Sequence, residues 1–435
     1  MSQRQLFSSP LATILTMIGV SVGLGNVWRF PYMMGQYGGS AFLVVYLFFT
    51  FAFAVPAVMA EWALGRATRR GPVGAFSAAF GKSWGRAIGF LLLFTVLTAN
   101  SYYIVVIANV AFSAWFAISN GFSETTIPAF SQQLGQGSLQ YAIALAILFG
   151  SLFVIYRGLN SGIEKVSRLF VPFFLVVMGA LVAFAFSLEG AVQEFVAFLK
   201  PDFSALGPAE IFAALGQTFF SLGLGGTFLL IYGSYLRDDA NIPRSAIWVA
   251  SGDVGAALLA SFFIAPAVLA LGLNMASGPG LIFSTLPNLF AQIPAGRMLG
   301  AFFLLALCAV ALLSNIAALE VLVGSVKDDL TPKLSRAKII LIIGVLEIIF
   351  ILPSAFNPNL IGVLDMIFGS GMQVFGGALA VLAITWGLGK SVMLNQVFGL
   401  EVGGLQRLLF HWLRWAVPGV LLVILASYIY TTLFG

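Results

Sequence analysis

The sequence predicts an all-α membrane protein that crosses the bilayer eleven times, and three features lead to this prediction. Of the 435 residues, 60% are hydrophobic and only 9% are charged, whereas roughly 25% of a soluble chain is charged. Apolar runs of membrane-spanning length recur along the chain. The basic residues fall mainly in alternate loops between these runs. This composition excludes a soluble enzyme, a nucleic-acid-binding protein and a disordered scaffold.

A helix needs roughly 20 apolar residues to cross the hydrocarbon core of a bilayer. Eleven runs meet this requirement, and they cover residues 11–35, 40–64, 86–118, 139–157, 165–187, 209–236, 245–273, 297–326, 337–353, 358–388 and 407–433. The first run is too long for a cleaved signal peptide, and glycine and asparagine interrupt its middle. We therefore expect it to form the first span.

The positions of lysine and arginine predict a cytoplasmic N-terminus, because positive residues collect in cytoplasmic loops. In that orientation, 18 of the 21 basic residues lie on the inside. Lys200 and Arg297 lie outside, and Arg29 falls within the first span. An odd number of spans then places the C-terminus outside. We expect a multi-pass protein of the cell (inner) membrane.

Two spans contain glycine clusters, the first at residues 19–26 and the sixth at residues 221–227. Each glycine costs up to about 1 kcal/mol in a helix interior, which favours local unwinding, although glycine also serves close packing of membrane helices. Gly-Leu-Gly occurs at 23–25 and again at 223–225, five spans later. Because five is odd, a five-span repeat returns in the opposite orientation. We therefore predict one domain, 1–435, with inverted repeats at about 11–187 and 209–388 and an extra span at about 407–433.

Two interrupted spans that meet near the bilayer midplane form a binding site for small ions and polar solutes. The N-termini of the half-helices face an anionic group, and the freed carbonyls hold a cation. The glycine clusters therefore predict discontinuous spans 1 and 6 and a site between them.

Motifs along nearly the whole chain resemble those of the neurotransmitter:sodium symporter family. They are residues 23–32 (GLGNVWRFPY), 61–66 (EWALGR), 100–103 (NSYY), 158–165 (GLNSGIEK), 217–223 (QTFFSLG) and 232–236 (YGSYL). The resemblance implies a LeuT-type fold and sodium-coupled uptake of amino acids or amines. Eleven spans, without a twelfth, resemble the bacterial members of the family.

The resemblance places a substrate carboxylate at the first break. Tyr103 would donate its hydroxyl together with the amides of Leu24 and Gly25, since a carboxylate in a dry site needs several donors. Gly23 stands where relatives that carry amines have an aspartate, so we expect an α-amino acid substrate. The other substrate-binding residues implied are Ser21, Ala99, Phe220, Ser221, Gly223, Gly226, Asn315 and Ala318.

Small residues line this implied pocket where relatives have larger ones. Gly226 is the largest difference, because a bulky gate side chain usually stands there. We therefore expect a bulky apolar or aromatic amino acid, with Asn315 available for a polar group. The alternative is that other side chains of this chain fill the space.

By resemblance, the Ser21 carbonyl, Asn26, Ser221 and Asp253 form a first sodium site. The family often has asparagine in place of Asp253, and a carboxylate inside a span is costly enough to indicate a functional site. Asp253 would bind sodium directly, or supply the negative charge that animal relatives obtain from chloride. A structural carboxyl paired with a hydroxyl is the alternative. We predict uptake that does not depend on chloride.

A second sodium site would use the carbonyls of Gly19, Val22 and Val310 and the hydroxyl of Ser314. The family normally has two adjacent hydroxyls in the eighth span, but the first of them is Leu313 here. Leucine offers no oxygen to the ion. We therefore predict one or two sodium ions as cofactors.

Two ion pairs are implied as gates. Arg29 and Asp365 would pair directly or through water on the outer side, and Arg4 and Asp328 would form an inner latch. Phe7 stands where a tryptophan is usual, which predicts a looser N-terminal clasp. Because exposed ion pairs often contribute little, we expect the outer pair to matter more.

Other functions remain open at the level of the sequence. A proton-coupled amino-acid transporter is suggested by Leu313 and Asp253, and an amino-acid sensor would bind without transport. An enzyme is not expected, because the sequence has no metalloprotease or serine-hydrolase motif. The partners predicted are a small amino-acid substrate and the lipid bilayer, with no nucleic acid, and the sequence carries no signal for an oligomeric state.

Overall fold

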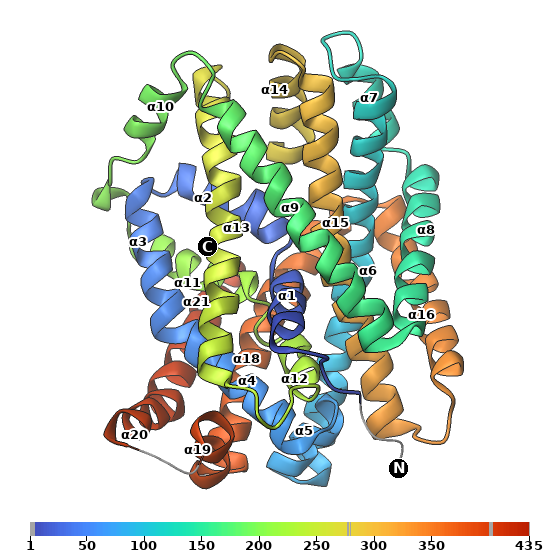
Figure 1. Ribbon diagram of the computed structural model, residues 1–435, viewed down its shortest axis with the longest axis vertical. Helices are drawn as coiled ribbons and strands as arrows, with labels where there is room; N and C mark the ends of the chain where they lie inside the picture. Colours follow the sequence, from blue (N-terminus) through green and yellow to red (C-terminus); the bar gives the residue numbers. More distant parts are fainter. Residues whose placement is uncertain (1–4, 276–277, 279, 400–402, 435) are drawn as a thin grey trace.

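Long apolar helices make up most of the protein, whose computed structural model describes all residues except 1–4, 276–277, 279, 400–402 and 435. The described residues contain no β-strand. Most of the helices run along the longest axis of an elongated bundle (Figure 1). The predicted all-α fold class is confirmed.

Nine helices within the described ranges are long and apolar enough to cross a membrane, and the bent first span is a tenth candidate. These ten correspond to ten of the eleven predicted spans. The nine are Ser40–Thr68, Lys82–Ser119, Gly137–Tyr156, Leu159–Ala185, Ile242–Ala270, Gly296–Leu330, Arg336–Phe356, Asn359–Gly387 and Gly404–Ser427. The predicted sixth span forms two shorter helices instead.

Figure 1 labels the helices in chain order. Those of the nine long spans are α3 (Ser40–Phe49), α4 (Val55–Thr68), α6 (Lys82–Ser119), α8 (Gly137–Tyr156), α9 (Glu164–Ala185), α13 (Ile242–Ala270), α15 (Gly296–Ser325), α16 (Arg336–Phe356), α17 (Asn359–Leu364), α18 (Met372–Leu382), α20 (Gly404–His411) and α21 (Val417–Phe434). Within these spans, π-helical turns occur at Thr50–Ala54, Leu159–Ile163, Val326–Leu330, Asp365–Gly371, Ala383–Gly387 and Trp412–Ala416. Shorter pieces are α5 (Pro72–Phe80), α7 (Ile127–Leu134), α10 (Ala191–Phe198), a 3-10 turn (Phe203–Ala205), a π turn (Leu281–Thr285), α14 (Leu286–Gln292) and α19 (Lys390–Phe398).

The first span breaks where the glycine cluster predicts. Helix α1 (Pro10–Ser21) begins with Pro10 in its first turn, and the Ser9 hydroxyl accepts from the Ala12 amide at 3.1 Å, a standard N-cap. The chain leaves the helix at Val22 and resumes as a π turn (Gly25–Arg29) followed by α2 (Phe30–Gln36). The two halves are bent by 59°.

The sixth span breaks between α11 (Pro208–Ser221) and α12 (Phe228–Gly233). Within the break, Gly223 and Gly225 have φ angles of 67° and 81°, in the left-handed region that favours glycine. A Cβ on Gly225 would lie 1.8 Å from the Gln373 carbonyl oxygen of α18. Glycine is therefore required here both for the turn and for close contact with α18.

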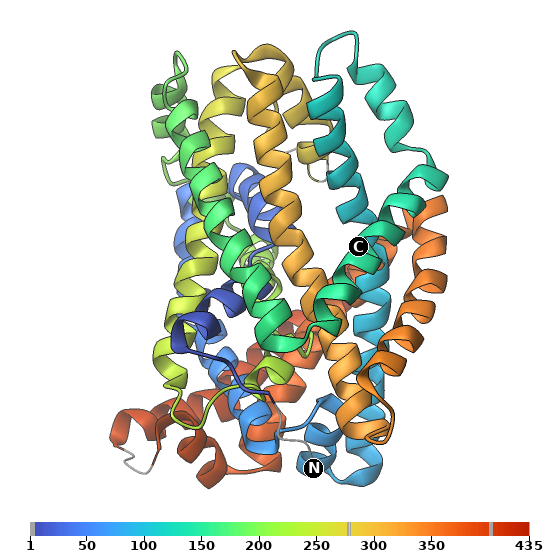
Figure 2. The same ribbon diagram turned by 45° about the vertical axis from the view of Figure 1, so that its right-hand side comes forward.

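The two ends of the bundle differ in structure and charge. Helices α7, α10 and α14 lie at one end, and α5, α19 and α20 lie at the other, with the described start of the chain (Figures 1 and 2). At that second end, five basic residues border one cavity of about 900 Å³ together with three aspartates. The basic residues are Arg69, Arg70, Lys82, Arg86 and Lys327, and the aspartates are Asp238, Asp328 and Asp329. The basic residues were predicted to share the cytoplasmic side, and they do lie together in space.

Candidate functional site

The breaks of the first and sixth spans meet at a central cavity of about 100 Å³. Its wall also includes residues of α6 and α15. Ten of the twelve predicted substrate-binding residues lie on this wall: Ser21, Gly23, Leu24, Gly25, Ala99, Tyr103, Phe220, Ser221, Gly223 and Ala318. The fold therefore gathers into one site residues that are far apart in the sequence.

Two of the twelve residues lie elsewhere. The Asn315 amide nitrogen donates to the Ser151 hydroxyl at 2.6 Å, so this side chain faces α8 and does not line the cavity. At Gly226, a Cβ would lie 2.1 Å from Cε2 of Phe228, and Phe228 itself lines the cavity. The expected polar role of Asn315 is thus corrected, and the space expected beside Gly226 is filled by a ring.

The Tyr103 hydroxyl faces the first break. It lies beside the Leu24 backbone and the Ser314 side chain. A Cβ on Gly23 would lie 3.1 Å from the Tyr103 oxygen. A side chain at position 23 would therefore occupy the space next to this hydroxyl, and glycine leaves it open. A phenolic O–H and unwound backbone amides are suitable donors for a carboxylate.

Four polar residues from four helical segments form one buried cluster. The Asn26 amide nitrogen donates to Asp253 Oδ1 at 2.7 Å and to the Ser221 hydroxyl at 2.9 Å. The Ser221 hydroxyl donates to Asp253 Oδ2 at 2.7 Å, and the Tyr46 hydroxyl lies 3.4 Å from the same oxygen. Tyr46 was not predicted, because it belongs to no motif that points to Asp253.

This cluster has the chemistry of an alkali-cation site. Asp253 is fully buried, and none of the ion pairs found in the described part of the chain involves it. A buried carboxylate without a cationic partner is strongly disfavoured. The Asp253 carboxylate and the Ser221 hydroxyl therefore offer oxygens that suit a monovalent cation, and Ser21 lies beside them on the cavity wall. The Asn26 amide oxygen instead accepts from the Gly23 amide at 3.0 Å, and the Asn26 nitrogen faces the cluster.

The second predicted ion site keeps only part of its ligands. The Ser314 hydroxyl of α15 donates to the Val20 carbonyl at 3.2 Å and approaches the Val22 carbonyl at 3.5 Å. Leu313 is buried, and a Cβ on Gly19 would lie 2.7 Å from its Cδ1 atom. The leucine thus packs against the position where an oxygen ligand is expected. Val310, one turn earlier on α15, is fully buried.

On the outer side, Arg29 does not form a direct ion pair with Asp365. Its guanidinium carbon lies 4.7 Å from the centre of the Phe220 ring, and its Nη1 atom has no hydrogen-bond partner among the described residues. Asp365 instead accepts a hydrogen bond from the Tyr102 hydroxyl at 3.0 Å. The directly paired form of the predicted gate is therefore corrected, because Arg29 stacks on Phe220.

Phe220 separates two cavities. It lines the central cavity and also a second cavity of about 230 Å³, which Arg29 borders together with residues of α11, α18 and α21. The ring therefore closes the central cavity toward the second one, with the Arg29 guanidinium over its face.

The inner latch is only partly visible. Arg4 lies outside the described residues, and Asp328 borders the large cavity beside α5. Phe7 is almost fully buried and packs against Tyr232 and Tyr235, with ring centres 6.2 and 6.4 Å away. Its amide also donates to the Tyr235 carbonyl at 3.1 Å. Phe7 thus packs the start of the described chain against the end of α12, and the looser clasp stays a prediction.

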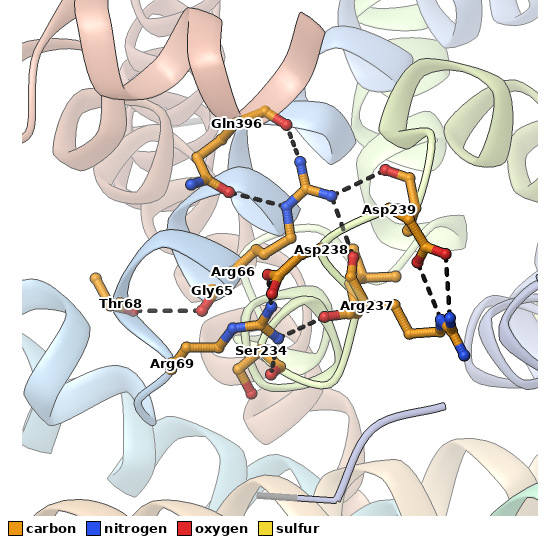
Figure 3. A network of polar contacts seen from close by, with 11 residues as sticks. Gly65, Arg66, Thr68, Arg69, Ser234, Arg237, Asp238, Asp239 and Gln396 are labelled. Carbon is orange, nitrogen blue, oxygen red and sulfur yellow. Dashed lines mark hydrogen bonds and ion pairs between the residues drawn. The ribbon is translucent and has the colours of Figure 1, made fainter. Parts of the chain in front are cut away.

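An arginine network that no sequence motif predicted lies at the same end of the molecule, and Figure 3 shows its contacts. Arg66, at the end of α4, donates to the Gln396 side-chain oxygen of α19 and to the Ala240 carbonyl, both at 2.8 Å. One turn further on, Arg69 pairs with Asp238. The network ties the second span to the link between α12 and α13 and to α19.

Comparisons of this chain with family models, curated proteins and solved structures all point to one family of transporters. A family model described as the sodium:neurotransmitter symporter family matches residues 4–124 and 119–433. The uncharacterized sodium-dependent transporter YhdH of Bacillus subtilis is 29% identical over 97% of both chains. The uncharacterized sodium-dependent transporter MJ1319 of Methanocaldococcus jannaschii is 29% identical over 91% of this chain and 84% of its own. The crystal structure of MhsT in complex with L-phenylalanine superposes with a TM-score of 0.87 and 32% identity, over 98% of this chain and 100% of that chain.

Proposed function

Because the chain belongs to the sodium:neurotransmitter symporter family, whose bacterial relatives are sodium-dependent transporters, we propose that it takes up an α-amino acid together with sodium by alternating access. The observation that carries this proposal is the meeting of two broken spans at one cavity. One side of the cavity offers donors for a carboxylate, and the other adjoins a buried anionic oxygen cluster.

The open space at Gly23 supports an amino acid over an amine. An amine substrate needs a carboxylate from the protein at this position, whereas an amino acid brings its own. The Tyr103 hydroxyl and the amides of Leu24 and Gly25 would bind that carboxylate. The substrate carboxylate and Asp253 would together balance the charge of a sodium ion held between them.

We propose one well-formed sodium site and a second, weaker one. Ser21, Asn26, Ser221 and Asp253 form the first. Gly19, Val22, Val310 and Ser314 would hold a second ion with fewer protein oxygens, because Leu313 packs beside Gly19. Because Asp253 already supplies a fixed negative charge, transport would not require chloride.

For the substrate side chain, we propose an apolar or aromatic group. The neighbour MhsT was solved with L-phenylalanine. The central cavity of about 100 Å³ is smaller than the roughly 150 Å³ of an engineered cavity that binds benzene. A large side chain would therefore require the Phe228 ring, which fills the space beside Gly226, to turn away from the cavity.

Uptake by purified protein in vesicles tests the proposal. An inward sodium gradient at constant pH should drive accumulation of a labelled amino acid, and an equal sodium concentration on both sides should abolish it. Competition by each of the twenty amino acids then ranks the substrates. A preference for glycine or alanine would contradict the proposed side-chain class, and the absence of sodium-driven uptake of any amino acid would contradict symport.

The loss of a hydroxyl at Leu313 favours one alternative, proton coupling. A proton gradient without sodium would then drive uptake in the same vesicles. A sensor would bind the amino acid in detergent and show no accumulation under either gradient. We also propose that the protein lies in the cell (inner) membrane with its N-terminus in the cytoplasm and its C-terminus outside.

A further inference from the structure

We propose that Asn100 and Glu347 form a selectivity pair, in which Asn100 accepts a hydrogen bond from the substrate side chain and Glu347 positions the Asn100 amide. The inference rests on the proposed function, because it concerns the substrate of the same cavity. It assigns the substrate class as an α-amino acid whose aromatic side chain carries a donor, the phenol of tyrosine or the indole of tryptophan.

Asn100 has the location that this role requires. It lies on α6 between Ala99 and Tyr103, and all three line the central cavity. Asn100 and Tyr103 are three residues apart, about 4.5 Å along a helix axis, on neighbouring positions of one face. A substrate whose carboxylate is bound by Tyr103 would therefore extend its side chain past Asn100.

The Asn100 amide is only half satisfied. Its Nδ2 atom donates to Glu347 Oε1 at 2.8 Å, whereas its Oδ1 atom has no hydrogen-bond partner among the residues that the structure describes. The residue is 2% exposed, so water does not freely compensate this oxygen. An unpaired buried acceptor is unfavourable, and a ligand that brings a donor would satisfy it.

Glu347 orients the Asn100 side-chain amide and so determines which of its two polar atoms stays unpaired. The Asn100 NH₂ group donates to Glu347 Oε1 and so points toward α16, which leaves the Asn100 carbonyl oxygen for another partner. Glu347 is fully buried, and the ion pairs found in the described part of the chain do not include it. Burying a carboxyl group in an apolar span costs free energy. Packing alone therefore does not explain why Glu347 stands here.

The residues of the wall beside the substrate side chain determine how strongly the Asn100 oxygen discriminates between substrates. Ala99, Gly223, Ala318 and Phe228 offer no polar side-chain atom to a substrate, whereas Tyr102, Asp365 and Gln373 also line the cavity with polar groups. A phenylalanine would leave Asn100 Oδ1 unpaired, whereas a phenol O–H or an indole N–H would bond to it. Sites built to bind a substrate donor discriminate against the analogue that lacks it.

The test compares pairs of ligands that differ only in the donor. Purified protein in sodium-containing buffer is titrated separately with tyrosine and phenylalanine, and with tryptophan and 1-methyltryptophan. The shift in Tm with ligand concentration gives each affinity. We expect the donor-bearing member of each pair to bind about tenfold more tightly. Glu347→Gln should bring both ratios close to one while phenylalanine still binds, because a glutamine amide can pair with either end of Asn100.

Ser354→Ala is the matched control, since Ser354 is a buried polar residue seven positions further along the same face of α16. It should leave both ratios unchanged. Asn100→Ala provides a second variant, and it should also remove the discrimination. Equal affinities within each pair in the wild-type protein would overturn the inference. Failure of the proposed function is separate, because it would appear as absent sodium-driven uptake in vesicles while the binding ratios persist.

Discussion

At the scale of single residues, Asp253 supplies the negative charge of the proposed ion site. Its carboxylate is fully buried, and it has neutral partners in Asn26, Ser221 and Tyr46. Removing a charge from water costs several kcal/mol unless an opposite charge compensates it. Hydrogen bonds from amides and hydroxyls reduce this cost, and a sodium ion would remove most of it. The hydroxyl partners also fit the structural carboxyl that the sequence left as an alternative, so the ion-binding role stays a prediction.

A first prediction follows from this charge. Replacing chloride by gluconate should leave sodium-driven uptake by the wild-type protein unchanged, because Asp253 supplies the negative charge. Asp253→Ser should lose most uptake in gluconate and regain part of it in chloride, since an anion can enter the space of the carboxylate. Initial rates in vesicles measure both effects. Chloride dependence of the wild-type protein would contradict the prediction.

A second prediction concerns Tyr103. Tyr103→Phe removes the hydroxyl that faces the first break and should weaken substrate binding by about 10-fold to 100-fold, in line with the roughly 1.5–3 kcal/mol of a hydrogen bond to a charged group. Tyr141→Phe is the control, because the Tyr141 hydroxyl donates to the Ile348 carbonyl of α16 at 3.1 Å. Substrate titration in sodium gives both affinities. Equal affinities for the two variants would exclude Tyr103 as a carboxylate ligand.

At the scale of elements, the two broken spans create the cavity, and glycine makes each break possible. In the sixth span, Gly225 accepts a left-handed φ of 81° and a contact that leaves no room for a Cβ. Its amide also donates to Glu61 Oε2 of α4 at 3.1 Å. The break is therefore fixed on one side by α4 and on the other by α18.

The third prediction tests this break. Gly225→Ala should abolish uptake and lower the Tm, because the Cβ would collide with the Gln373 carbonyl of α18 and the backbone would be strained. Gly179→Ala on α9 is the matched control, since its Cβ would meet no atom within 4 Å. Normal uptake by Gly225→Ala would show that the break is looser than this structure indicates.

The fourth prediction concerns the contact between α1 and α15. Leu313→Ser places a hydroxyl beside that of Ser314 and should strengthen sodium binding at the second site, which raises the Hill coefficient for sodium. The protein should also become less stable, because a buried leucine is lost. Leu312→Ser controls for the stability loss, since Leu312 is the neighbouring, partly buried leucine of α15 and packs against buried apolar side chains. An unchanged sodium response would place the second ion elsewhere.

At the scale of the whole molecule, basic residues from distant parts of the chain gather at one end of the bundle. Basic residues that are distant in sequence border one cavity beside α5, while α7, α10 and α14 form the other end (Figure 2). The basic residues fall in alternate loops along the sequence, and the fold brings these loops together at one end of the bundle. This arrangement supports a cytoplasmic location for the basic end.

The fifth prediction tests this orientation. In a Cys308→Ala background, a membrane-impermeant thiol reagent applied to intact cells should label Glu124→Cys, which lies in the link before α7. It should not label Asn395→Cys on α19 until the membrane is opened. Both positions are exposed, so accessibility in the folded protein is matched. The opposite pattern would reverse the orientation.

Most of the central cavity could be predicted, because its backbone is encoded locally. Glycine clusters weaken a helix wherever they occur, so the two breaks could be located without a structure. The prediction failed for Asn315, whose amide turns toward Ser151, and for Gly226, whose space is taken by Phe228. Side-chain direction depends on neighbours that sequence spacing does not identify. The contact between Asn100 and Glu347 likewise could not be predicted from the sequence.

The sequence by itself determined the fold class, the positions of the spans and the two breaks, because hydropathy and helix propensity act over short stretches of chain. Only the tertiary structure decided that Asp253 meets Asn26, that Arg29 lies over Phe220 and that Asn100 pairs with Glu347. These contacts join residues from different spans. They depend on how the helices rotate and pack, which is fixed by the whole bundle rather than by any one segment.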